Sequence, residues 1–177
     1  MRMARRVGMG MVIKPIWLYD GGLVDGYKWN CTTGNISTGG SAEASYTNGK
    51  LYVKTYKGSG NANNMYAQCA VYPTGGSATG GVNIDVRKYK QLHAYVSEGS
   101  RYHMDGWPYI AINEGLSDEC YVNLEPPSSG DNLSAGERIA NIRSVSYLKT
   151  VRVCARLTKT SQTAAQYLLS VTKIWLD

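Results

Sequence analysis

Residues 151–157 read Val-Arg-Val-Cys-Ala-Arg-Leu, and this run decides the fold class. An apolar residue stands at every second position, which is the period of a β-strand that buries one face. Two sets of side chains should therefore point in opposite directions: Val151, Val153, Ala155 and Leu157 toward a core, and Arg152, Cys154 and Arg156 away from it. A strand of this kind needs a second layer against its apolar face.

Similar short apolar runs recur along the chain, and turn-forming clusters separate them. The stretches 74–81 and 126–130 consist largely of Gly, Ser, Thr and Pro, which are typical of turns. The expected strands lie at residues 16–19, 51–56, 65–72, 82–86, 92–96, 109–112, 121–124, 151–157 and 167–176. Residues 135–145 fit either a helix or a further strand. About nine strands without a helical repeat predict an all-β fold, a two-sheet antiparallel β-sandwich of jelly-roll type.

The first and last expected strands resemble one another. Ile16-Trp17-Leu18 near the start recurs as Ile174-Trp175-Leu176 near the end. A closed sandwich has to cover the edges that its outermost strands expose. We therefore expect these two strands to pair antiparallel, and we expect Trp17 and Trp175 to be core residues because of their strand positions.

Length and charge divide the chain into an arm and one domain. The 177 residues suit a single domain, which we place at residues 15–177, behind a basic N-terminal arm at residues 1–14. The formal charge is +6, and four cations precede the first acid, Asp20. Subtracting these four from +6 leaves about +2, so the domain is nearly balanced and the arm is basic.

The arm also holds four of the six methionines, together with glycines that disfavour a stable helix. Methionine side chains adapt to irregular surfaces, so such a segment can become ordered on a partner protein. We expect an assembly arm whose contacts come from Arg2, Arg5, Arg6, Met9 and Met11. The alternative is an N-terminal segment that is disordered and has no role in assembly.

Composition and motifs argue against several classes of function. The domain lacks the basic stripe of a nucleic-acid binder, so nucleic acid is not an expected partner. No apolar run approaches the ~20 residues of a membrane span, so membrane insertion is not expected. With two histidines and no C-x-x-C pair, we expect no metal site and no other cofactor.

No arrangement of residues indicates an enzyme, and the chain has no G-x-S-x-G motif. Four acids lie close together in sequence: Asp118, Glu119, Glu125 and Asp131. We expect these to be solvated loop charges. The alternatives are a carboxylate pair for glycoside hydrolysis and a Ca²⁺ site, although no loop shows the acid density of a Ca²⁺-binding loop.

The four cysteines, Cys31, Cys69, Cys120 and Cys154, are far apart in the chain. We expect all four to be unpaired thiols in a protein made in a cytoplasm, with Cys69 acting as a small core residue. Two disulfides remain the arithmetical alternative.

The loop at residues 98–108 has the richest chemistry in the sequence. A sugar is bound by aromatic rings that contact its C–H faces and by polar side chains that bind its hydroxyls. That mixture occurs here, and the candidate carbohydrate site consists of Arg101, Tyr102, His103, Asp105 and Trp107. The alternative is structural, because a large aromatic residue such as Trp107 commonly fills the end of a sandwich.

Tyrosines on the polar side of expected strands offer a second candidate surface. Tyr66, Tyr72 and Tyr95 each alternate with apolar residues, so their side chains should be exposed. They could line a sheet face that contacts glycans or neighbouring subunits, since tyrosine is enriched at interfaces.

Several stretches resemble a group of small phage virion domains. The opening Ile16-Trp17-Leu18-Tyr19-Asp20-Gly21-Gly22, the Gly/Ser/Thr-rich stretch after it, and Gly49-Lys50-Leu51-Tyr52-Val53 carry this resemblance. The ending, Val151-Arg152-Val153 through Val171-Thr172-Lys173-Ile174-Trp175-Leu176, is similar to their last two strands. These domains are jelly-roll modules that resemble carbohydrate-binding domains, in tail and accessory proteins of phages of gut Gram-positive bacteria.

The resemblance implies a bacteriophage virion structural or accessory protein that assembles through its N-terminal arm. Its expected partners are other virion proteins and further copies of itself in a homo-oligomer, and its location is the virion, after synthesis in the host bacterial cytoplasm. The chain departs from the usual pattern because a short arm, and not a long fibre, precedes the domain, so tail, neck and head surface all remain open. The alternative is a carbohydrate- or receptor-binding module that attaches to host-surface glycans.

Overall fold

The structure is a computed structural model that describes residues 13–61, 64–73, 82–102, 108–124, 131–158 and 165–177. These residues form strands, turns and loops, and no helix occurs among them. The strands are β1 (Ile16–Asp20), β2 (Tyr27–Gly34), β3 (Ser41–Ser45), β4 (Leu51–Tyr56), β5 (Met65–Pro73), β6 (Ile84–Asp85), β7 (Gln91–Tyr102), β8 (Tyr109–Ile112), β9 (Cys120–Val122), β10 (Asn132–Leu133), β11 (Gly136–Asn141), β12 (Tyr147–Leu148), β13 (Val151–Leu157) and β14 (Gln166–Leu176). A helix that could cross a membrane is likewise not found in these ranges.

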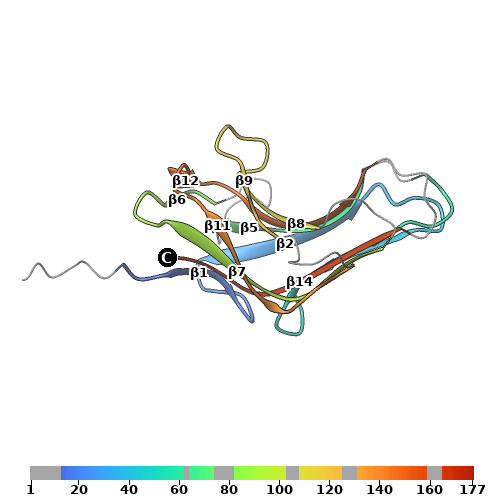
Figure 1. The fold of residues 1–177 in the computed structure, drawn as a ribbon, viewed down its shortest axis with the longest axis horizontal. Coiled ribbons are helices and arrows are strands. Elements are labelled where there is room, and N and C mark those ends of the chain that lie inside the picture. The colour runs from blue at the N-terminus through green and yellow to red at the C-terminus, as the bar shows by residue number, and fades with distance from the viewer. Residues whose placement is uncertain (1–12, 62–63, 74–81, 103–107, 125–130, 159–164) are drawn as a thin grey trace, which may run out of the picture.

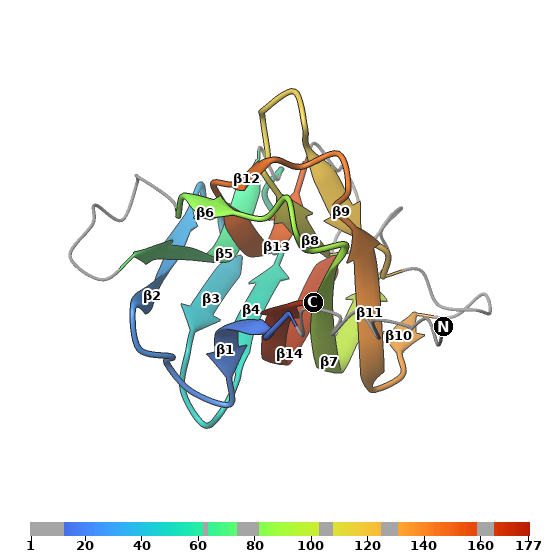
Figure 2. The same cartoon turned by 90° about the vertical axis from the view of Figure 1, so that its left-hand side faces the viewer.

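The strands form two antiparallel sheets that pack face to face (Figure 1, Figure 2). Sheet A runs β10-β7-β14-β4-β3, with β1 beside β14 and β11 beside β7. Sheet B runs β2-β5-β13-β8-β9, and the short strands β6 and β12 pair separately. In Figure 1 sheet A is the lower layer and sheet B the upper one. The prediction of an all-β, two-sheet antiparallel sandwich is confirmed.

The core lies between the sheets and is built from alternate residues of each strand. In β4, Leu51, Val53 and Thr55 are buried, and the residues between them are partly exposed. In β13 the four apolar residues of the run 151–157 are buried, as predicted, and the two arginines point away from the core. Burying one aliphatic side chain contributes roughly 1.5–3 kcal/mol, so a register shift of one residue would be strongly disfavoured.

The strands at the two ends of this domain pair as predicted. β1 runs antiparallel to β14, with Trp17 opposite Trp175. The prediction that both tryptophans are core residues is wrong. Ile174 and Leu176 face inward, so the alternation of the strand turns Trp175 onto the outer face of sheet A, and Trp17 lies beside it there.

The prediction of four unpaired cysteines is wrong for two of them. Cys31 and Cys69 form a disulfide, with their Cα atoms 4.1 Å apart. The two residues stand directly opposite each other on β2 and β5. The prediction fails because residues 27–34 are not among the expected strands, so this register is not visible in the sequence. Cys120 and Cys154 are free thiols, and Cys69 lies in the core, as expected.

Residues 135–145, which fit either a helix or a strand, contribute the strand β11. This strand pairs with β7 from Gly136 opposite Val96 to Asn141 opposite Gln91. β10 continues the same side of the sheet and places Leu133 against Gly99 of β7, where a Cβ would lie 2.5 Å from the leucine side chain. Both β10 and β11 therefore lie on the same side of β7: β11 pairs with the first half of β7, and β10 pairs with residues near its end.

Candidate functional site

The outer face of sheet A carries three stacked rings, Trp17, Trp175 and His93, on the neighbouring strands β1, β14 and β7. The ring centroids of Trp17 and Trp175 are 5.1 Å apart, with an interplanar angle of 30°. Those of His93 and Trp175 are 4.8 Å apart, at 11°. These spacings match the roughly 4.8 Å between strands, so the rings stand side by side and cover one another's faces. A ligand that stacks on an aromatic ring needs a free ring face. Between neighbouring members of this row the ring faces already contact one another, so a ligand cannot stack there.

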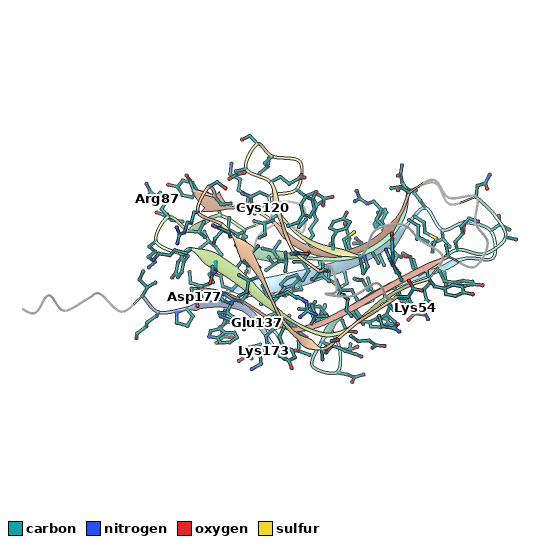
Figure 3. The ribbon with its side chains drawn as sticks, in the orientation of Figure 1. Lys54, Arg87, Cys120, Glu137, Lys173 and Asp177 are labelled. Carbon is teal, nitrogen blue, oxygen red and sulfur yellow. A yellow bond between two sulfur atoms is a disulfide. The ribbon has the colours of Figure 1, made fainter. Side chains whose placement is uncertain are left out.

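Charged side chains flank this aromatic row. His93 Nδ1 lies 2.6 Å from Glu137 Oε1, and its Nε2 lies 2.9 Å from Asp177 Oδ1. Only the Nδ1 contact is a hydrogen bond, because Nε2 is buried without a hydrogen-bond partner and lies near Asp177 by distance alone. Lys173 Nζ lies 5.6 Å from the centroid of Trp17. Figure 3 shows Glu137, Lys173 and Asp177 along this side of the molecule. The row is a structural stack that joins three strands.

The outer face of sheet B carries a different group, which we call the sheet-B cluster: Tyr109, Glu114, Tyr121, Arg152 and Arg156. Glu114 lies at its centre. The Tyr109 hydroxyl donates to Glu114 Oε1 at 3.1 Å, and Arg152 Nη1 donates to Oε2 at 3.0 Å. Arg156 Nη1 lies 3.5 Å from Oε1. The Tyr121 ring packs edge to face with Tyr109, with centroids 5.8 Å apart. Two guanidinium groups surround the carboxylate of Glu114, and Glu119 adds a second carboxylate beside Tyr121.

The cluster rests on two small side chains, Ala111 and Cys154, which are fully buried on the outer side of sheet B. Burial raises the pKa of Cys154 and, together with the nearby thiol and carboxylate, that of Tyr109. The Tyr109 phenol therefore stays protonated and donates a hydrogen bond to Glu114, and Cys154 stays an unreactive thiol. A hydrogen bond to Glu119 raises the pKa of Tyr121 to about 12.

Asn113, which is fully buried, fixes the loop that carries Glu114. Its φ of 54° lies in the left-handed region, which asparagine tolerates better than most residues. Its side-chain amide binds Asp118 Oδ2 (3.0 Å), Tyr147 O (2.9 Å), Lys149 N (2.7 Å) and Thr150 N (3.2 Å). These bonds join the β8–β9 loop to the segment between β12 and β13. The position of Glu114 is therefore set by the scaffold beside it.

The polar surface continues from the cluster toward β5 and β2. Tyr66 stands opposite Arg156, and Gln68 Nε2 donates to Thr32 Oγ1 of β2 at 3.2 Å. The Tyr66 ring covers Gly34, where a Cβ would lie 2.7 Å from the ring. In Figure 1 the strands of sheet B dip between the two ends of the sandwich, and the β8–β9 loop rises beside them. The outer face of sheet B is therefore a polar, aromatic-bearing surface.

The predicted carbohydrate loop is described only in part. Arg101 and Tyr102 close β7, where Arg101 Nε pairs with Asp131 Oδ1 at 3.3 Å and Tyr102 is 48% exposed. His103, Asp105 and Trp107 lie outside the described residues. So do the predicted arm residues, which are Arg2, Arg5, Arg6, Met9 and Met11. These candidate residues therefore stay predictions.

The structure separates the tyrosines that were expected to share one sheet face. Tyr66 lies on the outer face of sheet B, and Tyr95 lies on that of sheet A, where it is 40% exposed. Tyr72 is on the same strand as Tyr66, and its side chain is outside the part of the chain that the structure describes. The strand alternation predicts that each is turned away from the core, but it does not predict to which sheet a strand belongs.

The acids that were weighed as a catalytic pair or a Ca²⁺ site each have local partners where the structure describes them. Asp118 accepts from Asn113, and Asp131 pairs with Arg101. Glu119 accepts from the Gly115 amide and the Tyr121 hydroxyl, and these bonds lower its pKa. Glu125 lies outside the described residues. Within the described ranges no three His, Cys, Asp or Glu side chains gather as a metal site would require.

Sequence reasoning identified Arg152 and Arg156 as outward residues but missed the site that they form. The signal that was available is the placement of two arginines on the polar side of a strongly apolar strand. No protein-family model matches the chain, and no curated protein matches it either. The function therefore has to be inferred from the sites themselves.

Proposed function

We propose that this chain is a non-enzymatic, carbohydrate-binding domain of a bacteriophage virion and that the outer face of sheet B binds the glycan. The observation that carries the proposal is the sheet-B cluster, in which Glu114, Tyr109 and two arginines meet on an exposed sheet face. On the outer face of sheet A, by contrast, the three rings of the aromatic row cover one another.

The chemistry of the cluster suits a ligand with many hydroxyl groups. A hydroxyl both donates and accepts hydrogen bonds, and the cluster offers guanidinium and phenol donors beside a carboxylate acceptor. Arg152 and Arg156 keep about a third of their side-chain surface exposed, at 32% and 33%. Tyr121, 48% exposed, adds an aromatic surface at the edge of the cluster. A ligand can therefore reach donors, an acceptor and a ring on one face.

Binding fits this cluster better than hydrolysis does. A glycosidase needs one carboxyl group that is neutral and a second that is ionised. Glu114 is occupied by ion pairs with Arg152 and Arg156, and hydrogen bonds from the Gly115 amide and the Tyr121 hydroxyl lower the pKa of Glu119. Glu119 is therefore not a neutral carboxylic acid that could protonate a leaving group.

Two observations support placement of this domain in a jelly-roll virion protein. The chain passes repeatedly between the sheets, from β2 in sheet B to β3 and β4 in sheet A and back to β5, a connectivity compatible with a jelly roll. The Cys31–Cys69 disulfide is of a kind that persists at virion and cell surfaces and is rare in a cytosol. The resemblance of the end strands to phage domains supports the same assignment, with the N-terminal arm as the part that joins the particle.

A glycan array with matched variants tests the binding face. Tyr121→Ala removes an exposed ring from the sheet-B cluster, and Tyr95→Ala removes a comparably exposed ring from sheet A. We expect Tyr121→Ala to weaken glycan binding tenfold or more, the equivalent of about 1.4 kcal/mol, and Tyr95→Ala to leave it unchanged. The reverse result would move the site to sheet A, and no binding by the unmodified protein would refute the carbohydrate ligand.

Mass spectrometry of purified particles tests the virion assignment separately. We expect the chain as a stoichiometric component, and we expect removal of residues 1–13 to leave a folded domain that no longer joins the particle. Full incorporation of the shortened chain would show that the sandwich itself provides the attachment.

A further inference from the structure

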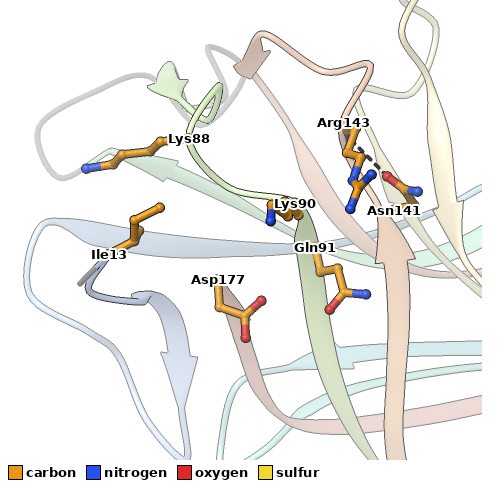
Figure 4. A pocket seen from close by; sticks show the side chains of 7 residues that line it. All are labelled: Ile13, Lys88, Lys90, Gln91, Asn141, Arg143 and Asp177. Atoms are coloured by element: carbon orange, nitrogen blue, oxygen red, sulfur yellow. Dashed lines mark hydrogen bonds between the residues drawn. The ribbon is translucent and has the colours of Figure 1, made fainter. Parts of the chain in front are cut away.

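A polar pocket of about 370 Å³ opens at the end of sheet A where β7 begins and β11 ends. Its lining residues are Ile13, Lys88, Lys90, Gln91, Asn141, Arg143 and Asp177. Figure 4 shows Lys90, Gln91, Asn141 and Arg143 gathered on one side, with Ile13 and Asp177 on the other. The volume lies in the range of roughly 300–1,000 Å³ that small-molecule sites occupy. None of these residues belongs to the sheet-B cluster.

Backbone hydrogen bonds hold the walls of this pocket in place. The Lys90 amide donates to the Asp177 carbonyl at 2.8 Å, and the Ile142 amide donates to the Lys90 carbonyl at 3.0 Å. The Arg143 amide donates to Asn141 Oδ1 at 3.1 Å, the bond drawn in Figure 4. Three segments from distant parts of the sequence therefore meet at fixed positions, so the pocket exists before a ligand arrives.

The charges around the pocket are unbalanced. Among the described lining residues, Lys88, Lys90 and Arg143 contribute three cations and Asp177 contributes one carboxylate. That carboxylate already faces His93 Nε2 at 2.9 Å. Lys88 Nζ lies over the Tyr89 ring, 5.2 Å from its centroid. Among the described residues, neither Lys90 nor Arg143 has an acidic partner.

We propose that this pocket binds a small polar ligand that carries an oxyanion group, such as a phosphate, sulfate or carboxylate on a sugar-sized body. Arg143 presents a planar fork of donors that suits an oxyanion, and Lys90 adds a second positive charge. The amides of Gln91 and Asn141 both donate and accept, so they can bind the uncharged part of the ligand. The site does not depend on glycan binding by sheet B.

NMR titration of the full chain with four probes tests the proposal: inorganic phosphate, glucose 6-phosphate, glucuronate and glucose. We expect saturable shifts of the backbone amides of residues 88–91 and 141–143 with the three anions and none with glucose. Tighter binding of glucose 6-phosphate than of phosphate would identify a sugar-borne anion, and equal affinities would identify a free oxyanion. Saturation by glucose at the same amides would overturn the proposal.

Matched substitutions separate a built site from general positive charge. Arg143→Gln and Lys90→Gln should each weaken phosphate binding tenfold or more, because each removes a charge-assisted hydrogen bond. Lys54→Gln and Arg138→Gln remove the same charges elsewhere, and Lys54 lies toward the other end of the molecule (Figure 3). Equal losses in both pairs, or shifts that never saturate, would overturn the proposal. Tyr121→Ala should leave phosphate binding unchanged whether or not the glycan site exists.

Discussion

The two sheets hold their N-terminal strands in different ways. In sheet A, β1 is joined to β14 from the outside, by the stack of Trp17 on Trp175 and of Trp175 on His93. In sheet B, β2 is joined to β5 from the inside, by the Cys31–Cys69 disulfide. The stacked rings on the outer face of sheet A therefore help to hold that sheet together, whereas the outer face of sheet B carries charged and phenolic groups.

This difference separates exposed aromatic content from binding capacity. Among the described residues, the largest group of stacked rings is one whose members cover one another's faces. The sheet-B cluster has fewer rings, but its donors converge on the acceptor Glu114, and its two arginines keep contact with solvent. In a sandwich of this kind, the sheet face that is not needed for stability is therefore the better candidate for a binding surface.

Removal of the disulfide should have the largest effect on stability. The bond closes a loop with a sequence separation of 38, and loops of this size contribute about 2–4 kcal/mol through the entropy of the unfolded chain. We expect Cys31→Ser with Cys69→Ser to lower the free energy of unfolding by that amount in urea titrations. Cys120→Ser, which removes a free thiol, is the matched control. Equal losses in the two proteins would mean that β2 does not depend on the covalent bond.

Loss of the central ring of the aromatic row should have the next largest effect. Trp175 stacks on both Trp17 and His93, and each aromatic contact contributes roughly 0.5–1.5 kcal/mol beyond area burial. We expect Trp175→Ala to lower the free energy of unfolding by about 2 kcal/mol without changing glycan binding. Tyr95→Ala on the same face should lower it by less than about 0.5 kcal/mol. If Trp175→Ala abolished glycan binding in a folded protein, the contrast between the two faces would be lost.

The smallest effect concerns Tyr109 at high pH. Burial raises its pKa in the folded protein above the ordinary value of about 10, so the unfolded chain loses this proton first. The stability that it contributes is complete below pH 10 and declines as the pH rises beyond that value. We expect Tyr109→Phe to make the decline between pH 9 and pH 11 shallower by at most about 1 kcal/mol, because partial solvent contact screens the group. Urea titrations across that range, with Tyr95→Phe as control, measure the difference, and identical slopes would contradict it.

The strands that follow a strict alternation could be predicted from the sequence, and so could the pairing of β1 with β14. β2 was missed although Tyr27, Trp29 and Thr33 favour strands, and β3 could not be predicted because its residues do not. Ser41–Ser45 reads Ser-Ala-Glu-Ala-Ser, and it is extended because β4 pairs along it. Without β2, the proximity of Cys31 and Cys69 could not be foreseen either.

The candidate site was less predictable than the fold because it joins residues that are distant in the chain. Arg152 could be assigned to an outer face, but its partner Glu114 lies in a turn whose position depends on buried Asn113. Trp17 and Trp175 show the opposite error. Their size and strand position favoured the core, and the register of Ile174 and Leu176 placed them outside.

The order of synthesis gives the central strands a further consequence. β13 joins β5 to β8 in sheet B, and β14 joins β4 to β7 in sheet A, yet both are the last of the described strands to leave the ribosome. Until then each sheet exists as two halves with unpaired edges, which are prone to pair with other chains. Closure of the sandwich must therefore follow translation of β14, and until then the edges of β4, β5, β7 and β8 that β13 and β14 will cover are open to wrong pairing.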